Sequence, residues 1–125
     1  WMSAVREFGK RGGLIGIGED AGFIYNIYGF GMIRSMELHQ EDGFPALKVI
    51  EQATANNGRI LGMENRLGRV RAGYAADLLV LNGNPVEDLK ILYPKPGRLG
   101  IEWTIKDGIP YSVGRLESEV RALVK

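Results

Sequence analysis

Cysteine is absent from this chain of 125 residues, and histidine occurs once. The absence of cysteine excludes disulfides, thiolate chemistry and cysteine-type zinc sites, and it fits a reducing compartment, so we expect a cytoplasmic protein. A single histidine is too few for most histidine-based metal sites. The sequence also has no apolar run approaching the ~20 residues that a membrane-spanning helix needs, so we expect no membrane partner.

Charge of one sign is not in excess either. Sixteen Lys and Arg residues stand against fifteen Asp and Glu residues, and the formal net charge is +1. Nucleic-acid binders usually carry a clustered basic stripe, whereas the basic residues here are interspersed with acids, so we expect no nucleic-acid partner. The hydrophobic fraction of 45% and the charged fraction of 25% are typical of a globular domain with one core.

The front half of the chain reads as mixed α/β. Residues 14–18, "LIGIG", are short, apolar and bounded by glycines, which predicts a buried strand of the parallel type. A helix is expected before it, and two more are expected over residues 32–43 and 44–58. The last of them should stop at Asn57-Gly58, with residues 59–62 as one further short turn in the alternative. Helices that alternate with a buried strand and a loop are typical of α/β folds.

The back half shows mostly strand patterns. Residues 78–81 form a short apolar run, and residues 101–106 alternate between apolar and polar side chains. Asp107-Gly108 predicts a type I′ hairpin turn after them. The chain closes with an amphipathic helix. We place a boundary near residue 64, giving units 1–64 and 65–125. The stripe of the last helix consists of Leu116, Val120, Leu123 and Val124.

Asp20 is the first candidate functional residue. It follows the predicted strand, at the end where α/β folds place catalytic groups. The alternative is a solvated acid or one that caps the next element. Glu19 should point elsewhere by strand alternation, which favours a structural role. Tyr25, Asn26 and Tyr28 follow closely, and they either line a pocket beside Asp20 or pack the loop onto the rim of the fold.

Other reactive-looking features are weaker. His39 lies in the predicted helix with no metal-ligating partner four residues away, so we expect a partly exposed helical histidine. The glycines of "GLIGIG" lie inside the predicted strand, and no Walker lysine follows them, which argues against a phosphate-binding loop.

One long stretch resembles a known family. "GEDAG" at 18–22 and then "ATANNGRILGMENRLGRVRAGYAADLLVLNGNPVEDL" resemble the C-terminal portion of the metal-dependent amidohydrolase superfamily, nearest to its imidazolonepropionase-like and prolidase-like branch. The resemblance covers residues 13–111. It implies the last strand and flanking helices of a (β/α)₈ barrel (1–64), followed by the C-terminal strands of a small β-sandwich with a terminal helix (65–125), present as a fragment.

The resemblance also implies a chemistry. Asp20 falls on the family's final-strand aspartate, a metal ligand and the general base for the attacking hydroxide. The stretch from Tyr25 to Tyr28 would lie in the loop over the active-site mouth. The complete enzyme would use one or two divalent ions, with zinc favoured, to hydrolyse C–N bonds of a dipeptide, cyclic amide or related small molecule. Glu19 stands where relatives commonly have a small hydroxyl residue.

The same resemblance identifies what is missing. Family members take further ligands from a His-x-His pair, from a mid-barrel lysine or acid and from two more histidines. Of this set of ligands, this chain has only the carboxylate of Asp20. A catalytic metal normally has three protein ligands, so we expect an inactive fragment that binds no metal or substrate by itself. The alternative is a non-catalytic α/β module. It would form homo-oligomers through exposed strand edges, or it would complete a split amidohydrolase with a separate N-terminal half.

Overall fold

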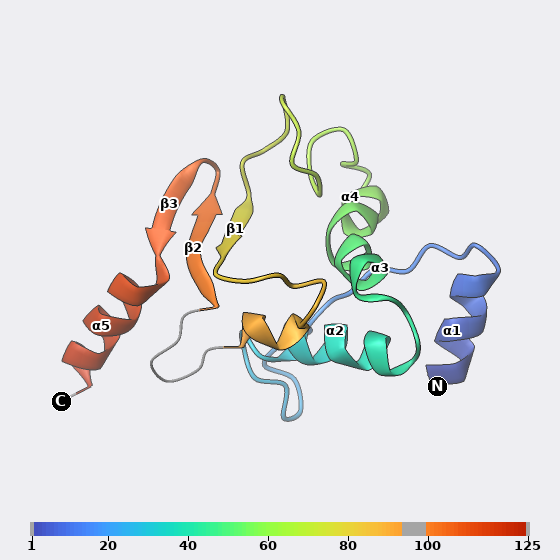
Figure 1. Cartoon of the computed structure of the whole chain (residues 1–125), viewed down its shortest axis with the longest axis horizontal. Helices are drawn as coiled ribbons and strands as arrows, with labels where there is room; N and C mark the ends of the chain where they lie inside the picture. The colour runs from blue at the N-terminus through green and yellow to red at the C-terminus, as the bar shows by residue number, and fades with distance from the viewer. Residues whose placement is uncertain (1, 94–99, 125) are drawn as a thin grey trace.

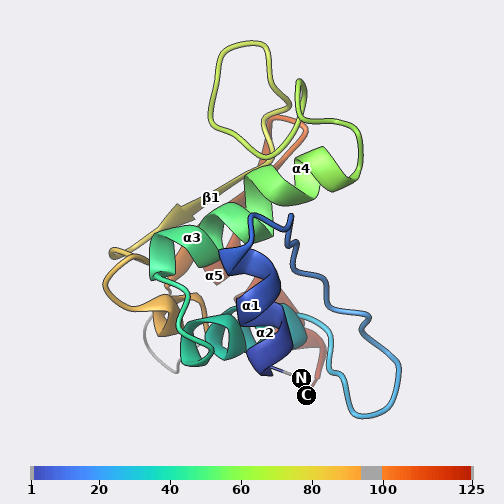
Figure 2. The same cartoon turned by 90° about the vertical axis from the view of Figure 1, so that its right-hand side faces the viewer.

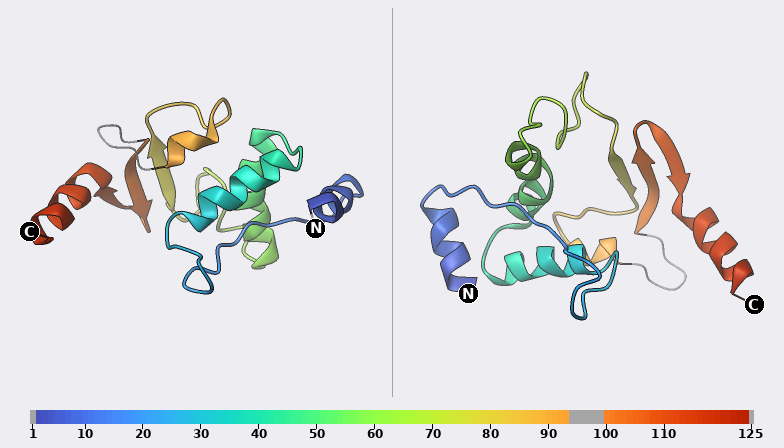
Figure 3. Two further views of the ribbon diagram at one scale, coloured as in Figure 1. Left: turned by 90° about the horizontal axis from the view of Figure 1, so that it is seen from below. Right: turned by 180° about the vertical axis from the view of Figure 1, so that it is seen from behind.

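The structure is a computed structural model, and it describes residues 2–93 and 100–124. A three-stranded sheet stands beside a group of helices, and the first and last helices lie at opposite ends of the long axis (Figures 1 and 3). Among the described residues, no helix is long and apolar enough to cross a membrane. The mixed α/β class is confirmed. The elements are α1 (Met2–Lys10), α2 (Gly31–Glu41), α3 (Ala46–Glu51), the π-helical turn η1 (Gln52–Asn56), α4 (Asn57–Ile60), β1 (Leu78–Leu81), the 3₁₀ turn η2 (Leu89–Leu92), β2 (Ile101–Lys106), β3 (Ile109–Ser112) and α5 (Val113–Leu123).

Helix α2 ends where the sequence predicts. Gly43 adopts a left-handed φ of +93° just beyond it, which is the conformation that glycine accepts without a steric penalty. The Gly43 N–H donates to the Gln40 carbonyl at 2.8 Å, and the Phe44 N–H donates to the His39 carbonyl at 3.1 Å. This pair of bonds is a Schellman motif, and it satisfies carbonyls that the helix end leaves without a partner.

The next helical stretch runs on through α3, η1 and α4, so the predicted stop at Asn57-Gly58 is wrong, and the alternative of a further turn over residues 59–62 is nearer to the structure. The helix continues to Ile60 and ends before Gly62, which has a φ of +67°. Gly58 is buried, and a side chain there would place its Cβ 2.9 Å from the Leu67 carbonyl oxygen. The glycine therefore permits a close approach between the helix and the following turn.

The strands form one antiparallel sheet in the order β1-β2-β3. Val80 of β1 and Ser112 of β3 both pair with Trp103 on the central strand. Asp107 and Gly108, between β2 and β3, have φ values of +51° and +81°. Two consecutive positive φ angles define the predicted type I′ turn, whose twist matches that of the flanking strands.

The predicted strand at residues 14–18 does not form. Among the described residues no strand pairs with this segment. A strand exists only as part of a ladder with a neighbour, and an apolar, glycine-bounded run is also compatible with a buried segment held in another way. The segment is nevertheless part of the interior, because the side chain of Ile17 is buried.

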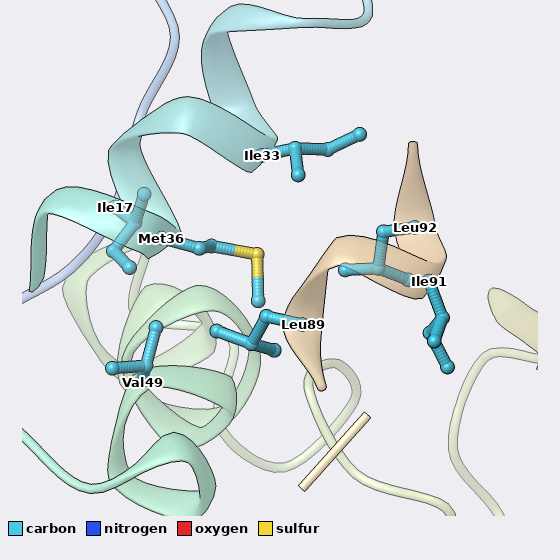
Figure 4. Packing of buried hydrophobic residues seen from close by; sticks show 7 residues of the cluster. All are labelled: Ile17, Ile33, Met36, Val49, Leu89, Ile91 and Leu92. Carbon is cyan, nitrogen blue, oxygen red and sulfur yellow. The ribbon is translucent and has the colours of Figure 1, made fainter. Parts of the chain in front are cut away.

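One core joins the two halves of the chain. Figure 4 shows Met36 of α2 between Ile17 and Val49 on one side and Leu89 of η2 on the other. Val49 and Leu89 are 0% and 1% exposed. Figure 2 shows α2 and α3 side by side, as their contacts require. The division into units 1–64 and 65–125 stays a prediction.

Helix α5 confirms the predicted terminal helix, and its apolar stripe is exposed. It contacts β2 and β3 near its start and then extends from the sheet (Figure 1). None of its residues is buried by the described part of the chain. The exposed stripe consists of Leu116, Val120, Leu123 and Val124.

Candidate functional site

Asp20 lies at the start of an exposed loop that runs from residue 20 to residue 30. The Asp20 side chain is exposed, and its backbone has a left-handed φ of +49°. Ile24 and Tyr25 in the same loop also have positive φ angles, of +29° and +62°. Such conformations are costly for residues other than glycine, above all for a β-branched one, and they concentrate at functional sites. The loop is therefore the most strained part of the described backbone.

Glu19 connects the start of this loop to its end and to Asn26 through hydrogen bonds. One carboxylate oxygen, Oε1, accepts a hydrogen bond from the Gly31 N–H at 3.2 Å, at the start of α2. A negative charge there is stabilised by the unpaired N–H groups and the dipole of the helix. The Asn26 side-chain amide donates to the backbone carbonyl of Glu19. Glu19 thus has the structural role that its place in the sequence favoured.

The three predicted substrate contacts have different surroundings. Tyr25 is 99% exposed and Tyr28 is 74% exposed. Asn26 is partly buried, and its carbonyl accepts the Gly22 N–H at 3.0 Å. Asn26 therefore shapes the loop, and the Tyr25 side chain projects from it. The Tyr28 ring lies back over the loop, because a Cβ added to Gly22 would come within 2.7 Å of the Tyr28 hydroxyl oxygen. Substrate binding by these residues, like metal binding by Asp20, stays a prediction.

The described residues do not by themselves build a metal centre. Within 2–93 and 100–124, no three His, Cys, Asp or Glu side chains lie close enough to share an ion. His39 is occupied elsewhere: its Nδ1 lies 2.8 Å from the Oε1 of Gln52, and its ring packs on Phe44. This arrangement agrees with the helical, non-ligating role expected for His39. Asp20 alone does not fit a catalytic zinc, which normally has three protein ligands.

Two asparagines that the sequence analysis did not select hold the segment before Asp20. The Asn57 side chain accepts the Ile17 N–H at 3.1 Å and donates to the Ile17 carbonyl at 2.8 Å. The Asn56 side chain donates to the Ile15 carbonyl at 2.7 Å. The one signal in the sequence is the pair of adjacent amides at 56–57, and we interpreted Asn57 together with Gly58 as a helix stop.

Two polar clusters elsewhere tie the fold together. Asp77, before β1, accepts the Asp107 N–H at 2.8 Å and pairs with Lys106 at 3.0 Å. These two contacts lower the pKa of Asp77, and the same carboxylate raises the pKa of Lys106. The Tyr93 hydroxyl donates to Glu37 at 2.8 Å, linking the end of η2 to α2. Burial raises the pKa of Tyr93, and the bond to Glu37 adds to this shift.

The family of the chain follows from comparison with known proteins. The model of the amidohydrolase family matches residues 2–109. The chain therefore belongs to the amidohydrolase family. The resemblance inferred from the "GEDAG" and "ATANNGRILG" segments is confirmed.

Individual relatives include prolidase-like proteins and a deaminase. The structure superposes on a Xaa-Pro dipeptidase with bound methionine at a TM-score of 0.74 and 32% identity, covering 89% of this chain and 25% of that one. It superposes on a protein assigned as a prolidase from Bifidobacterium longum at a TM-score of 0.77 and 28% identity, covering 99% of this chain and 30% of that one. A 5-methylthioadenosine/S-adenosylhomocysteine deaminase from Syntrophomonas wolfei is 50% identical over 38 residues, which are 30% of this chain and 9% of the deaminase. The chain thus spans less than a third of the length of each of these three relatives.

Proposed function

We propose that this chain supplies the C-terminal part of a metal-dependent, prolidase-like amidohydrolase that hydrolyses C–N bonds. The observation that carries the proposal is the superposition on a Xaa-Pro dipeptidase at 32% identity over 89% of the chain. In this proposal residues 1–64 belong to the last part of a (β/α)₈ barrel, and residues 65–125 belong to a small β-sandwich. The substrate class is a dipeptide or a related small amide.

Asp20 is the proposed metal ligand and base. Its place supports this role, because it is exposed, follows a segment anchored in the core and opens a strained loop. A carboxylate can bind a divalent cation, zinc in the first instance, and can also accept a proton. Tyr25, Asn26 and Tyr28 are the proposed substrate contacts, since amphipathic side chains beside a carboxylate suit small-molecule binding. The other metal ligands would come from outside this chain.

The isolated chain should accordingly be inactive and free of metal. Within the described residues no three potential metal ligands lie close enough to share an ion, which supports this expectation. Elemental analysis of the dialysed chain for zinc, manganese, iron and nickel should give well under one ion per chain. An isolated chain that holds stoichiometric metal and hydrolyses amides would contradict it.

Reconstitution tests the positive half of the proposal. The chain is co-purified with a Xaa-Pro dipeptidase relative from which the matching C-terminal quarter has been removed. The complex should bind divalent metal and hydrolyse Xaa-Pro dipeptides. Asp20→Asn should lower kcat by about 10²- to 10⁴-fold. The matched control is Glu102→Gln on the exposed side of β2, which should keep wild-type activity. An Asp20→Asn complex with full activity would eliminate the assigned role.

A second candidate is a non-catalytic module that associates through its uncovered surfaces. The apolar stripe of α5 favours it, because Leu123 and Val124 are exposed by 83% and 80%. Such stripes normally pack against another surface. Light scattering of the purified chain should then give a defined homo-oligomer, whereas a monodisperse monomer would contradict this candidate.

A further inference from the structure

The backbone that leads to Asp20 is held by side chains in the way that a neighbouring strand would hold it. A side-chain amide carries a donor and an acceptor side by side. The Asn57 amide uses both on a single residue, bonding the N–H and the C=O of Ile17. Asn56 adds a bond to the carbonyl of Ile15, two residues earlier. Three backbone groups that a β-ladder would pair are therefore satisfied without a strand.

Burial makes these bonds effective. Asn56 is 4% exposed and Ile17 is 5% exposed, so water competes poorly for the same groups. A buried backbone group that loses its partner keeps the full cost of its desolvation. Ile17 also belongs to the central core cluster. The segment is thus fixed both by its side chain and by its backbone.

On the other side of the contact between Asn57 and Ile17, Gly16 leaves room for the Asn57 amide. A Cβ added to Gly16 would lie 2.3 Å from the Asn57 Oδ1 and 2.6 Å from the Ile60 Cδ1. Only glycine allows the amide to approach so closely. Gly18, two residues nearer to Asp20, has open space where a Cβ would lie, with no atom within 4 Å.

The π-helical turn η1 precedes the second asparagine. It spans Gln52–Asn56, and α-helical geometry resumes at Asn57. A π turn shifts the helical register and so redirects the side chains that follow, and such turns are frequent at functional sites. The Asn57 Nδ2 also lies 3.2 Å from the Ala53 carbonyl, four residues earlier. This second contact orients the amide from within its own helix.

We propose that Asn56 and Asn57 are positioning residues for Asp20. By fixing the path of residues 15–17, they set where the carboxylate three residues further on is presented. The catalytic consequence rests on the function proposed for Asp20, whereas the hold on the backbone does not. The competing possibility is that the two amides only add to the overall stability of the fold.

An NMR experiment on the full chain separates these possibilities. Amide hydrogen exchange and amide chemical shifts are measured for the ¹⁵N-labelled wild type and for Asn57→Ala, Gly16→Ala and Gly18→Ala. Asn57→Ala removes the amide, Gly16→Ala displaces it from the other side of the contact, and Gly18→Ala is the matched control. In the first two variants the Ile17 amide should exchange about tenfold faster. The Asp20 amide resonance should also shift, while the amides of β2 keep their wild-type rates.

Three other results of the NMR experiment would each overturn the proposal. Equal acceleration at Ile17 and throughout β2 would show that the amides contribute only to global stability. Unchanged exchange at Ile17 would show that they do not hold the segment. An unmoved Asp20 resonance would remove the link between the segment and the carboxylate.

The reconstituted complex gives the catalytic readout. Asn57→Ala should lower kcat with little change in KM, and it should have no further effect once Asp20 is replaced by Asn. Additive losses in the double variant would overturn the positioning role. If the wild-type complex is itself inactive, the proposed function fails. The NMR result then still decides whether the two amides position Asp20.

Discussion

The sheet and the segment before Asp20 satisfy their backbones by different means. In β1, β2 and β3 the N–H and C=O groups bond to other backbone groups in an antiparallel register, which shifts once between Val80 and Leu81. At Ile15 and Ile17 the same groups bond to the side chains of Asn56 and Asn57. A ladder is built from any sequence that can extend, whereas the second arrangement depends on two particular residues. Single substitutions should therefore affect the two regions very differently.

The two regions also differ in backbone strain. The sheet has one non-glycine residue with a positive φ, Asp107, in a turn type that requires it. The loop after residue 19 has three, at Asp20, Ile24 and Tyr25. Conformations of this kind persist only where the surroundings hold them. The anchors on either side of the loop, at Ile17 and Gly31, are what the structure offers for that purpose.

The largest effect is expected where the two regions share a core. Leu89→Ala removes a side chain that is 1% exposed and belongs to the core cluster, in which it lies beside Met36 of α2 (Figure 4). Deleting buried methyl groups and leaving a cavity should reduce the free energy of unfolding by about 2–5 kcal/mol. Urea unfolding followed by circular dichroism measures this. Leu79→Ala, at a position 52% exposed, is the control and should cost far less.

The same unfolding experiment on Leu89→Ala also tests whether the sheet and the helices unfold independently. Because Leu89 packs against Met36 of α2 (Figure 4), we expect the amide signals of α2 and β2 to disappear over the same range of urea. Separate transitions for the two elements would show that the sheet and the helices fold as distinct units.

A smaller effect, confined to the sheet, is expected at its hairpin turn. Gly108 has a φ of +81° and no atom within 4 Å of an added Cβ, so the cost of Gly108→Ala is purely conformational. A residue with a Cβ in the left-handed region costs about 1–2 kcal/mol. Gly18→Ala, in equally open space without a positive φ, should leave the free energy of unfolding unchanged or slightly higher. Equal values for the two variants in thermal unfolding would contradict this interpretation.

The same contrast explains what could be predicted of the fold. The Asp107-Gly108 hairpin and the end of α2 at Gly43 were predicted correctly, because each depends on glycine in a local turn or cap. The strand at 14–18 was not, because pairing depends on a neighbour that a local pattern does not contain. The stop at Asn57-Gly58 was wrong for a related reason: the asparagine bonds to a segment forty residues away in sequence.

In the candidate site, too, features that depend on neighbouring residues were easier to predict than those that depend on residues distant in the sequence. A structural role for Glu19 was expected from strand alternation; the strand does not form, but the bond from Gly31 to Glu19 agrees with that role. The importance of Asn56 and Asn57 could not be predicted, since nothing near them in sequence indicates Ile15 or Ile17 as a partner. The ligand role of Asp20 depends on side chains still more distant, so it stays a prediction.

The smallest expected effect is on the stability of the sheet at acidic pH, through the carboxylate of Asp77. The Asp107 N–H, and then Lys106, lower the pKa of Asp77 below that of an unfolded aspartate, which is about 3.9. The stabilisation is therefore fully present above that value and is lost as the pH falls through the lower, folded-state pKa. Because Asp77 is exposed, water and salt weaken the pairing. In Asp77→Asn the free energy of unfolding should depend less on pH below about 4 than in the wild type. Urea unfolding at neutral and acidic pH measures this, with Glu102→Gln on β2 as the matched loss of one carboxylate. If both variants keep the pH dependence of the wild type, the contact between Asp77 and the hairpin turn contributes nothing to the stability of the sheet.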